Sequence, residues 1–393
     1  MEITHVVNRF LPNLGGAELY VFNVSRRLIE LGNNVTVITT TSTKFRGIEK
    51  SRLSEKEIIN GIKVIRARAF LNGPGFVLAP TLAEVILNDD PDVFNIHIFL
   101  SNISLEATLI NKSFKKVPLV LTAHDITIAD HLREYIPLWK LYVYTLGKFL
   151  CKSVDSIIVQ NSQDASFLKS LGVSSSKIHV IPNGIDTRLY NRLNVSQNAQ
   201  EDFRERFKIK DKHVLLFVGR IEKRKRIDLL LYALKLISKE FGDKVILLIV
   251  GPDQGEKPAL LNLAKQLGIE NNIVFTGALE TKDLLAAYAV ADVFISLSAQ
   301  EAFGLSVVEA MSMEVPVVAH RWKGLSYILK DGVNGLSVSP FNFKELAEKT
   351  VFLLKNEEYR KSLAKANRSY VVQNFSIDRT VDQVLKVYRS ISS

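Results

Sequence analysis

The chain has 393 residues, which is too long for one ordinary hydrophobic core and suits two domains of roughly 150 to 200 residues each. With 47% hydrophobic and 23% charged residues, the composition is that of a folded globular protein and excludes a disordered or fibrous chain. The formal net charge of +10 favours anionic partners, which could be nucleotide phosphates, an anionic membrane surface or nucleic acid.

The single cysteine, Cys151, bears on the compartment. One cysteine can form neither an internal disulfide nor a zinc site built from cysteines, so we expect a reducing, cytoplasmic environment. Residues 1–7 run into an apolar segment without a basic leader, and no signal peptide is expected. No apolar run reaches the roughly 18 to 20 residues that span a bilayer.

Short apolar, β-branched runs alternate with helix-length amphipathic segments along the chain. This alternating pattern is typical of parallel strands that are buried on both faces and joined by helices. It predicts an α/β fold of two doubly wound, Rossmann-like domains. The expected strands are 35–38, 93–96, 119–122, 157–159 and 178–181 in the first half, and 214–218, 245–250, 273–275, 293–296 and 315–318 in the second.

A polar stretch, 186–212, carries no strand pattern and is typical of a connector between domains. It places the two domains at 1–186 and 187–374. The tail 375–393 has apolar residues at helical spacing opposite a polar face, which predicts a last helix that packs on another element.

Two candidate positions in the first domain follow expected strands. Gly15 and Gly16 open a helix after the first strand, where glycines let the backbone close over a phosphate or a sugar. His124 ends a later strand and could donate a hydrogen bond to a sugar or polarise a reacting group. Glycine turns are common and a lone histidine is often structural, so both positions also have a purely structural interpretation.

The segment 131–152 mixes aromatic residues and leucines with Arg133, Lys140, Lys148 and Lys152. This mixture suits a helix that rests on an anionic lipid surface. It equally suits a helix that packs inside the first domain.

A basic cluster follows the first strand of the second domain, in the sequence from Gly219 to Arg226. Because the carboxyl ends of strands in a doubly wound sheet share one crevice, Arg220 and Lys225 can converge on phosphates there. Lys223, Arg224 and Arg226 are interpreted as a solvated rim.

The segment 298–311 leads from a strand into an amphipathic helix. A helix N-terminus binds anions through its free N–H groups and its dipole, and Gly304 would let a phosphate approach the backbone. Glu301 stands in the turn and Glu309 lies about two helical turns further on, where ionised carboxylates can accept hydrogen bonds from hydroxyl groups. Alternatively, Glu301 caps the helix and Glu309 is a solvated helix residue.

These motifs, in this order and over nearly the whole chain, resemble the GT-B glycosyltransferases of family 4. The residues that carry the resemblance are Gly15 to Glu18, Pro182 to Asp186, Gly219-Arg220 with Lys225, Glu301 to Glu309, and Asp331 to Gly335.

The resemblance implies a role for each candidate. Arg220 and Lys225 would hold the diphosphate of a nucleotide-sugar donor, Glu301 the sugar hydroxyls and Glu309 the ribose. Further donor-binding positions are Gly15, Gly16, Phe303, Gly304 and Leu305, and His124 would contact the donor sugar near the reacting carbon.

The resemblance also implies an architecture and a mechanism. The first domain would take a glycan or lipid-linked acceptor, the second would take the donor across a shared cleft, and the last helix would cross back to the first domain. Transfer would retain the anomeric configuration, with the departing phosphate as base for the acceptor hydroxyl. No metal and no cofactor are implied, because basic side chains and a helix dipole stabilise the leaving diphosphate.

Three positions depart from the family pattern and leave the sugar and the base open. Arg226 and Glu314 stand where the family often has glycine, and Tyr327 stands in the place of a frequent glutamate.

Other interpretations remain. A non-catalytic partner subunit of this fold would bind donor without turnover, an epimerase would convert donor without an acceptor, and a phosphorylase would ordinarily need a lysine-bound pyridoxal phosphate. Nucleic-acid binding is not expected, because the sequence has no zinc module and no aromatic sheet motif.

Overall fold

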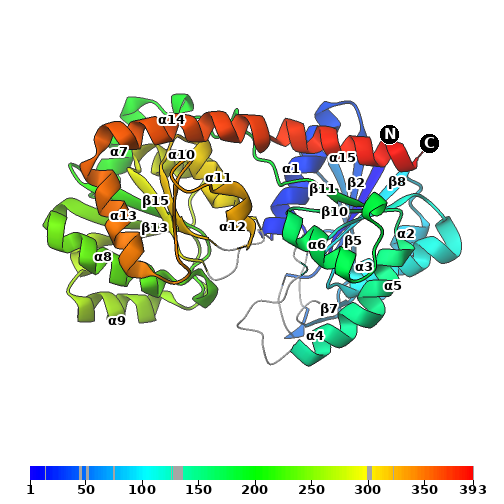
Figure 1. Cartoon of the computed structure of the whole chain (residues 1–393). Coiled ribbons are helices and arrows are strands. Elements are labelled where there is room, and N and C mark those ends of the chain that lie inside the picture. The colour runs from blue at the N-terminus through cyan, green and yellow to red at the C-terminus, as the bar shows by residue number, and fades with distance from the viewer. Residues whose placement is uncertain are drawn as a thin grey trace. The chain divides into compact units, whose positions relative to one another are not determined.

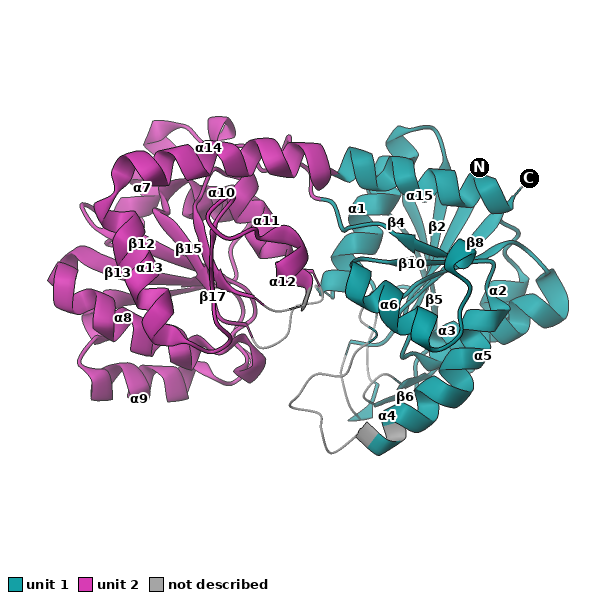
Figure 2. Ribbon diagram, viewed as in Figure 1, with its two compact units in different colours: residues 1–184, 377–393 teal, residues 185–376 magenta. Residues whose placement is uncertain are grey.

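The computed structural model describes residues 1–13, 15–43, 47–49, 53–73, 76–124, 126, 136–298, 303–321 and 323–392. The chain forms two compact units, shown in Figure 2. Unit 1 comprises Met1–Gly184 with Ile377–Ser393, and unit 2 comprises Ile185–Ser376. The first unit ends at Gly184, two residues before the boundary at residue 186 that the sequence predicts. Ile185 and Phe375, which lie at the two points where the chain passes between the units, are joined within unit 2, since the Ile185 N–H donates to the Phe375 carbonyl at 2.9 Å.

Unit 1 contains an eight-stranded sheet with helices on both faces, as Figure 1 shows. Its strand order is β11-β10-β9-β8-β1-β2-β5-β4, and all neighbours are parallel except the β4–β5 pair. The strands are β1 (Glu2–Val6), β2 (Asn34–Thr40), β4 (Lys56–Ile59), β5 (Ile62–Ala67), β8 (Val93–His97), β9 (Leu119–Thr122), β10 (Ser156–Val159) and β11 (Ile178–Val180). An antiparallel sheet joins β3 (Gly47–Ile48), β6 (Leu71–Gly73) and β7 (Phe76–Leu78).

The α-helices of unit 1 are α1 (Gly16–Glu30), α2 (Leu82–Leu87), α3 (Asn102–Ile110), α4 (Ile136–Tyr142), α5 (Lys148–Ser153), α6 (Ser162–Ser170) and α15 (Ile377–Ile391). Shorter helical turns are η1 (Asn111–Lys115), η3 (Val143–Gly147) and η4 (Ser175–Lys177).

The last helix, α15, belongs to unit 1 and packs beside α1. Its apolar face, which includes Val381 and Val384, shares a core with Val21 and Val24 of α1. Arg27 of α1 pairs with Asp378 at 2.5 Å. The helical period of the tail therefore corresponds to a face that is covered by the first unit.

Unit 2 contains a six-stranded sheet in the order β14-β13-β12-β15-β16-β17, and all its neighbouring strands are parallel. The strands are β12 (His213–Val218), β13 (Val245–Val250), β14 (Ile273–Gly277), β15 (Val293–Ser296), β16 (Val317–His320) and β17 (Leu336–Val338). The α-helices are α7 (Gln197–Arg206), α8 (Ile227–Phe241), α9 (Lys257–Leu267), α10 (Thr281–Val290), α11 (Leu305–Ser312), α12 (Lys323–Ile328), α13 (Phe343–Lys355) and α14 (Glu357–Asn374). Single turns are η5 (Arg192–Asn194), η6 (Lys223–Lys225), η7 (Gly242–Lys244) and η8 (Glu270–Asn272).

The sheet of unit 2 has a hydrophobic core on each face. On β12, Val214 and Leu216 contribute to one core, and Leu215 and Phe217 to the other. A strand that is buried on both faces needs an unbroken apolar run, which is the pattern that the sequence carries. The predicted α/β class with two doubly wound domains is therefore confirmed.

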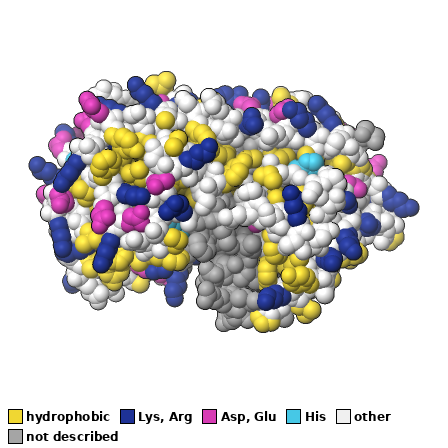
Figure 3. All heavy atoms as spheres, in the orientation of Figure 1, with side chains coloured by type: hydrophobic (Ala, Val, Ile, Leu, Met, Phe, Trp, Pro, Cys, Tyr) yellow, Lys and Arg dark blue, Asp and Glu magenta, His cyan; other side chains and the backbone are white. Residues whose placement is uncertain are grey.

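The surface carries many basic side chains, which Figure 3 shows over the visible faces of both units. Among the described helices, none has the length and apolar character needed to cross a bilayer.

Candidate functional site

In unit 2, the strand order reverses beside β12, which lies between β13 and β15. The carboxyl ends of β12 and β15 therefore flank a topological switch point, where doubly wound sheets bind their ligands. The segment after β12 carries Arg220 and Lys225, and the segment after β15 leads to α11. The structure thus brings the two candidate anion-binding segments of the sequence to one edge of one sheet.

The loop after β12 is fixed against the loop after β13. The Gly219 N–H donates to the Val250 carbonyl at 2.9 Å, and the Ile221 N–H donates to the Pro252 carbonyl at 2.9 Å. A Cβ atom on Gly251 would lie 2.0 Å from the Gly219 carbonyl oxygen, so this close approach requires glycine. Gly251 is a contributor to the site that the sequence analysis missed, although its place after an apolar strand could have indicated it.

The two basic residues of this loop lie in different surroundings. The Arg220 guanidinium is 3.5 Å from Oε1 of Glu222, and its side chain is 29% exposed. Lys225 closes the turn η6, and its Cε lies 3.7 Å from the position that a Cβ of Gly219 would take. Arg224 also pairs with Glu222, at 2.7 Å, so this residue of the expected rim belongs to a local ion-pair network.

The N-terminus of α11 follows Gly304, whose φ of 95° lies in the left-handed region that favours glycine. A Cβ atom here would meet Cδ2 of Leu325 at 2.4 Å. The absence of a side chain at Gly304 is therefore required by packing against α12, in addition to the predicted approach of a phosphate to the helix N-terminus. At the helix N-terminus itself, the Val307 N–H donates to the Gly304 carbonyl at 3.0 Å, whereas the N–H groups of Leu305 and Ser306 precede the first intrahelical bond.

The side chains next to Gly304 in the sequence, those of Phe303 and Leu305, differ in how far they are buried. Phe303 is 2% exposed and packs edge-on against Phe375 at 5.6 Å, so its side chain belongs to the core and only its backbone is left for a ligand. Leu305 is partly buried against the same core. Glu301, the predicted contact for sugar hydroxyls, lies outside the described residues.

Glu309 on α11 is partly buried and accepts a hydrogen bond from the Tyr288 hydroxyl at 2.7 Å. It is also hydrogen-bonded to Tyr190, and its burial raises the pKa of its carboxyl above the ordinary value. The alternative that Glu309 is a solvated helix residue is therefore wrong. Sequence analysis missed both tyrosines, which fix this carboxylate while leaving it capacity for further hydrogen bonds.

In unit 1 the strand order reverses between β1 and β8, which are neighbours in the sheet. Gly15 caps α1, and a Cβ on it would lie 2.3 Å from Oε2 of Glu18, which folds back over the turn. Among the described residues, a Cβ on Gly16 would have no neighbour within 4 Å. Of the two glycines, Gly16 therefore stands beside open space, as the sequence hypothesis of a sugar or phosphate contact requires.

His124 follows β9 with a φ of 57° and is 9% exposed. Its Nε2 is 3.0 Å from Nδ1 of His97, the last residue of β8. Burial lowers the pKa of His124 to about 3, so its ring is neutral at physiological pH. His97 was missed in the sequence, because nothing in the pattern of β8 indicates that this buried strand residue faces another histidine.

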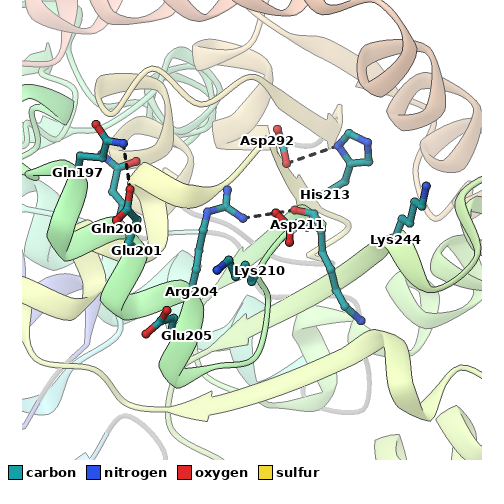
Figure 4. A pocket seen from close by; sticks show the side chains of 11 residues that line it. Gln197, Gln200, Glu201, Arg204, Glu205, Lys210, Asp211, His213, Lys244 and Asp292 are labelled. Carbon is teal, nitrogen blue, oxygen red and sulfur yellow. Dashed lines mark hydrogen bonds and ion pairs between the residues drawn. The ribbon is translucent and has the colours of Figure 1, made fainter.

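A polar pocket of 760 Å³ lies elsewhere in unit 2, between α7 and the amino ends of strands (Figure 4). His213 starts β12, while Lys244 and Asp292 immediately precede β13 and β15. Arg204 donates to the Val290 carbonyl at 3.0 Å across this region. The pocket lies at the opposite sheet edge from the switch point and includes none of the predicted site residues.

Among the residues that the structure describes, no group of three or more His, Cys, Asp or Glu side chains is arranged to hold a metal ion.

Comparison with protein families gives two matches that lie side by side along the chain. Residues 14–189 match the model of Glycosyltransferase Family 4, and residues 198–370 match the model of Glycosyl transferases group 1.

Similar proteins cover the chain from end to end. An uncharacterized glycosyltransferase of Methanocaldococcus jannaschii is 27% identical over 411 residues, which is 99% of this chain and 98% of that protein. The N-acetyl-alpha-D-glucosaminyl L-malate synthase of Bacillus anthracis is 23% identical over 97% of this chain and 95% of its own length. Among solved structures, HepE of Anabaena in complex with UDP and glucose has a TM-score of 0.79 at 22% identity, covering 99% of this chain and all of that one. At that identity the structural likeness concerns the fold.

Proposed function

Because the chain belongs to the group 1 glycosyl transferases, family 4 enzymes of the GT-B fold, we propose that it transfers a hexose from a nucleotide diphosphate-sugar to an acceptor hydroxyl with retention of configuration. The observation that carries the proposal is that the Arg220–Lys225 loop and the segment leading to α11 follow the carboxyl ends of the adjacent strands β12 and β15, at the switch point of the sheet. Two cationic side chains and a helix N-terminus together suit a diphosphate.

The proposed roles follow from charge and placement. Arg220 and Lys225 stabilise the negative charge that develops on the diphosphate as the glycosidic bond breaks. Glu309, held by its two tyrosines, accepts hydrogen bonds from the ribose hydroxyls. We assign the sugar hydroxyls to Glu301 from the sequence motif alone.

Unit 1 is proposed to bind the acceptor, which is a glycan or a lipid-linked sugar. The open turn at Gly16 lines the donor or acceptor side of the site, and the neutral His124 contacts the donor sugar near the reacting carbon. His124 acts as a hydrogen-bonding group at neutral pH, because its lowered pKa makes proton uptake unfavourable. The base for the acceptor hydroxyl is then the departing phosphate.

A uridine diphosphate donor is the first to test, since the similar HepE structure holds UDP and glucose. We expect the sugars of one nucleotide, UDP, GDP, ADP or TDP, to raise the melting temperature. At a ligand concentration one hundred times Kd, binding adds about 2.7 kcal/mol to the free energy of unfolding. The shift and the transfer rate should persist in EDTA, because side chains and a helix dipole neutralise the diphosphate without a metal. The anomeric configuration of the product, read by NMR, tests retention.

Each contrary outcome points to a different alternative. Binding without turnover would favour a non-catalytic partner subunit, and conversion of the donor without an acceptor would favour an epimerase. Loss of activity in EDTA that Mg²⁺ or Mn²⁺ restores would contradict metal independence. No shift with any nucleotide-sugar would count against the transferase.

We also propose that unit 1 contacts an anionic lipid surface on the cytoplasmic side, where a lipid-linked acceptor would be presented. The proposed membrane face comprises four exposed apolar residues of α4, η3 and α5, namely Leu141 (62% exposed), Tyr144 (60%), Leu146 (45%) and Phe149 (41%). Lys140, Lys148 and Lys152 are exposed among them, and the sequence 136–152 contains no acidic residue. The opposite side is buried, since a Cβ on Gly147 would lie 2.6 Å from the Phe99 ring. One helical segment thus has both a packed side and an exposed apolar, basic side, which Figure 3 shows in part at the lower edge of unit 1.

We expect the protein to float with phosphatidylglycerol vesicles at low salt and to release them as salt rises, since each lysine near the surface contributes about 1 kcal/mol. Replacing Leu141, Tyr144 and Phe149 together by serine should abolish flotation. Leu193→Ser, at a residue of unit 2 that is 88% exposed, is the matched control and should float like the wild type. A wild-type protein that stays in the lower fraction would end the membrane proposal.

A further inference from the structure

Three histidines form a continuous hydrogen-bonded chain across neighbouring strands of unit 1. Nδ1 of His5, on β1, lies 2.9 Å from Nε2 of His97, on β8. Nδ1 of His97 in turn lies 3.0 Å from Nε2 of His124, after β9. Since β1, β8 and β9 are adjacent in the sheet, the chain crosses its carboxyl edge at the reversal of strand order. It therefore starts inside the sheet, spans the reversal between β1 and β8, and ends after β9 at the carboxyl ends of the strands, which is the side on which doubly wound sheets bind ligands.

The surroundings of these rings keep them uncharged. His5 and His97 are fully buried, and burial lowers the pKa of His5 to about 3 and that of His97 far below its ordinary value. Tyr20 packs edge-on against His97 and His124, with ring centroids 6.0 and 5.0 Å away. The Tyr20 hydroxyl is buried, and the burial raises its pKa, so it stays neutral as well.

Among the described residues, no carboxylate is hydrogen-bonded to any of these three rings. In many sites a carboxylate orients a functional imidazole from behind. Here a second imidazole takes that position, and a third lies behind it.

Counting hydrogens fixes the direction of the chain. Three neutral imidazoles carry three N–H hydrogens, and the two bonds between rings use two of them. The third lies at one end, on Nε2 of His5 or on Nδ1 of His124. Nε2 of His5 is buried without a hydrogen-bond partner in the described part of the chain, and buried N–H groups without acceptors are rarer than bare acceptors. His124, by contrast, is the one residue of the three that is not fully buried, and neither of its ring nitrogens is among the buried atoms without a partner in the described part of the chain, so the third hydrogen is placed on its Nδ1.

We propose that His97, supported by His5, is a positioning residue that fixes His124 in the tautomer with hydrogen on Nδ1, so that His124 presents an N–H donor to an oxygen of the substrate sugar or acceptor. The inference rests on the proposed function insofar as His124 is assigned a substrate contact. In this arrangement His5 donates from Nδ1 to His97, and His97 donates from Nδ1 to Nε2 of His124. A sugar oxygen that approaches then meets a donor whose orientation is already set.

The tautomer can be tested without any substrate. In ¹⁵N-histidine-labelled full-length protein at neutral pH, the His124 ring should give the NMR pattern of a neutral imidazole protonated at Nδ1, assigned by its loss in His124→Gln. Protonation at Nε2, or a charged ring, would overturn the proposal. This reading does not depend on knowing the donor, so it separates failure of the inference from failure of the proposed function.

Two substitutions of His97 test the positioning role by rescue. Asn places its amide where Nδ1 of histidine lies, towards His124, whereas Gln reaches the Nε2 position, towards His5. We expect His97→Asn to stay within about threefold of wild-type kcat and His97→Gln to lose about tenfold, with the donor KM little changed in both. The groups that orient metal-bound imidazoles, which act in the same way, contribute about ten- to hundredfold. Melting temperatures show whether each variant is folded. Equal kcat values in two folded variants would contradict the proposal, and if neither folds the NMR result decides it.

Discussion

Replacing Lys225 by alanine is expected to lower kcat/KM by about a hundredfold or more, the effect of losing a transition-state charge contact of roughly 3 kcal/mol. Lys225 ends the turn η6 beside Gly219, within the loop that two backbone hydrogen bonds fix to the neighbouring β13 loop. Its ammonium group is therefore held near the switch point of the sheet. Steady-state kinetics with the donor found in the thermal-shift panel measures the change.

Lys223 is the matched control, because it belongs to the same turn but is exposed. Lys223→Ala removes the same charge at nearly the same place in the sequence and should change kcat/KM by less than about threefold, as screened surface charges do. If both variants lose activity equally, the loop acts through its general positive field. If Lys225→Ala has wild-type kinetics, Lys225 does not bind the diphosphate.

The parallel strands could be predicted from sequence because burial on both faces imposes an unbroken apolar run. The run at 245–250, for example, coincides with β13. The short antiparallel strands were not predicted, because their side chains are largely exposed and carry no such constraint. In β4 (Lys56–Ile59) three of the four residues are exposed, and both residues of β3 are exposed.

Two departures from the family pattern have a backbone explanation that sequence alone could not give. Arg226 has a φ of 51° and Glu314 has a φ of 59°, so both occupy the left-handed region in which glycine is least strained. Arg226 compensates with a bidentate ion pair to Asp228, at 3.0 and 2.9 Å, and a position over the Phe341 ring. Both substitutions thus place a residue with a side chain in a turn conformation that favours glycine.

The residues that hold the candidate site groups in place escaped the sequence analysis. Tyr190 and Tyr288 meet Glu309 from different segments of unit 2, and His5 and His97 meet behind His124 only because β1 and β8 are paired. The spacing of a motif in the sequence predicts which residues are neighbours within one turn or helix. These contacts join segments far apart in the sequence, so they depend on the order of the strands in the sheet. The groups that carry charge could thus be predicted, and the groups that orient them required the fold.

Replacing Glu309 by glutamine is expected to weaken donor binding by about thirty- to 150-fold, since hydrogen bonds to a charged group contribute roughly 2 to 3 kcal/mol. Glutamine keeps the shape of the side chain and an oxygen that can accept from Tyr288, so the fold should persist. The loss should appear in KM and in the Kd of the free nucleotide with kcat nearly unchanged, because the ribose is bound alike in ground and transition states.

The pH dependence of donor binding distinguishes a carboxylate contact at Glu309 from a loss of packing. Burial raises the pKa of Glu309, so the carboxylate takes up a proton at a higher pH than an exposed glutamate and loses its acceptor charge as pH falls through that raised value. As the pH is lowered, the wild-type Kd for nucleotide should therefore begin to rise at a higher pH than it would for an exposed glutamate. The Kd of Glu309→Gln should not change with pH. Tyr288→Phe removes one hydrogen bond that favours the charged form, so it should move the transition to still higher pH. Parallel pH curves for all three proteins would show that the ribose is bound elsewhere.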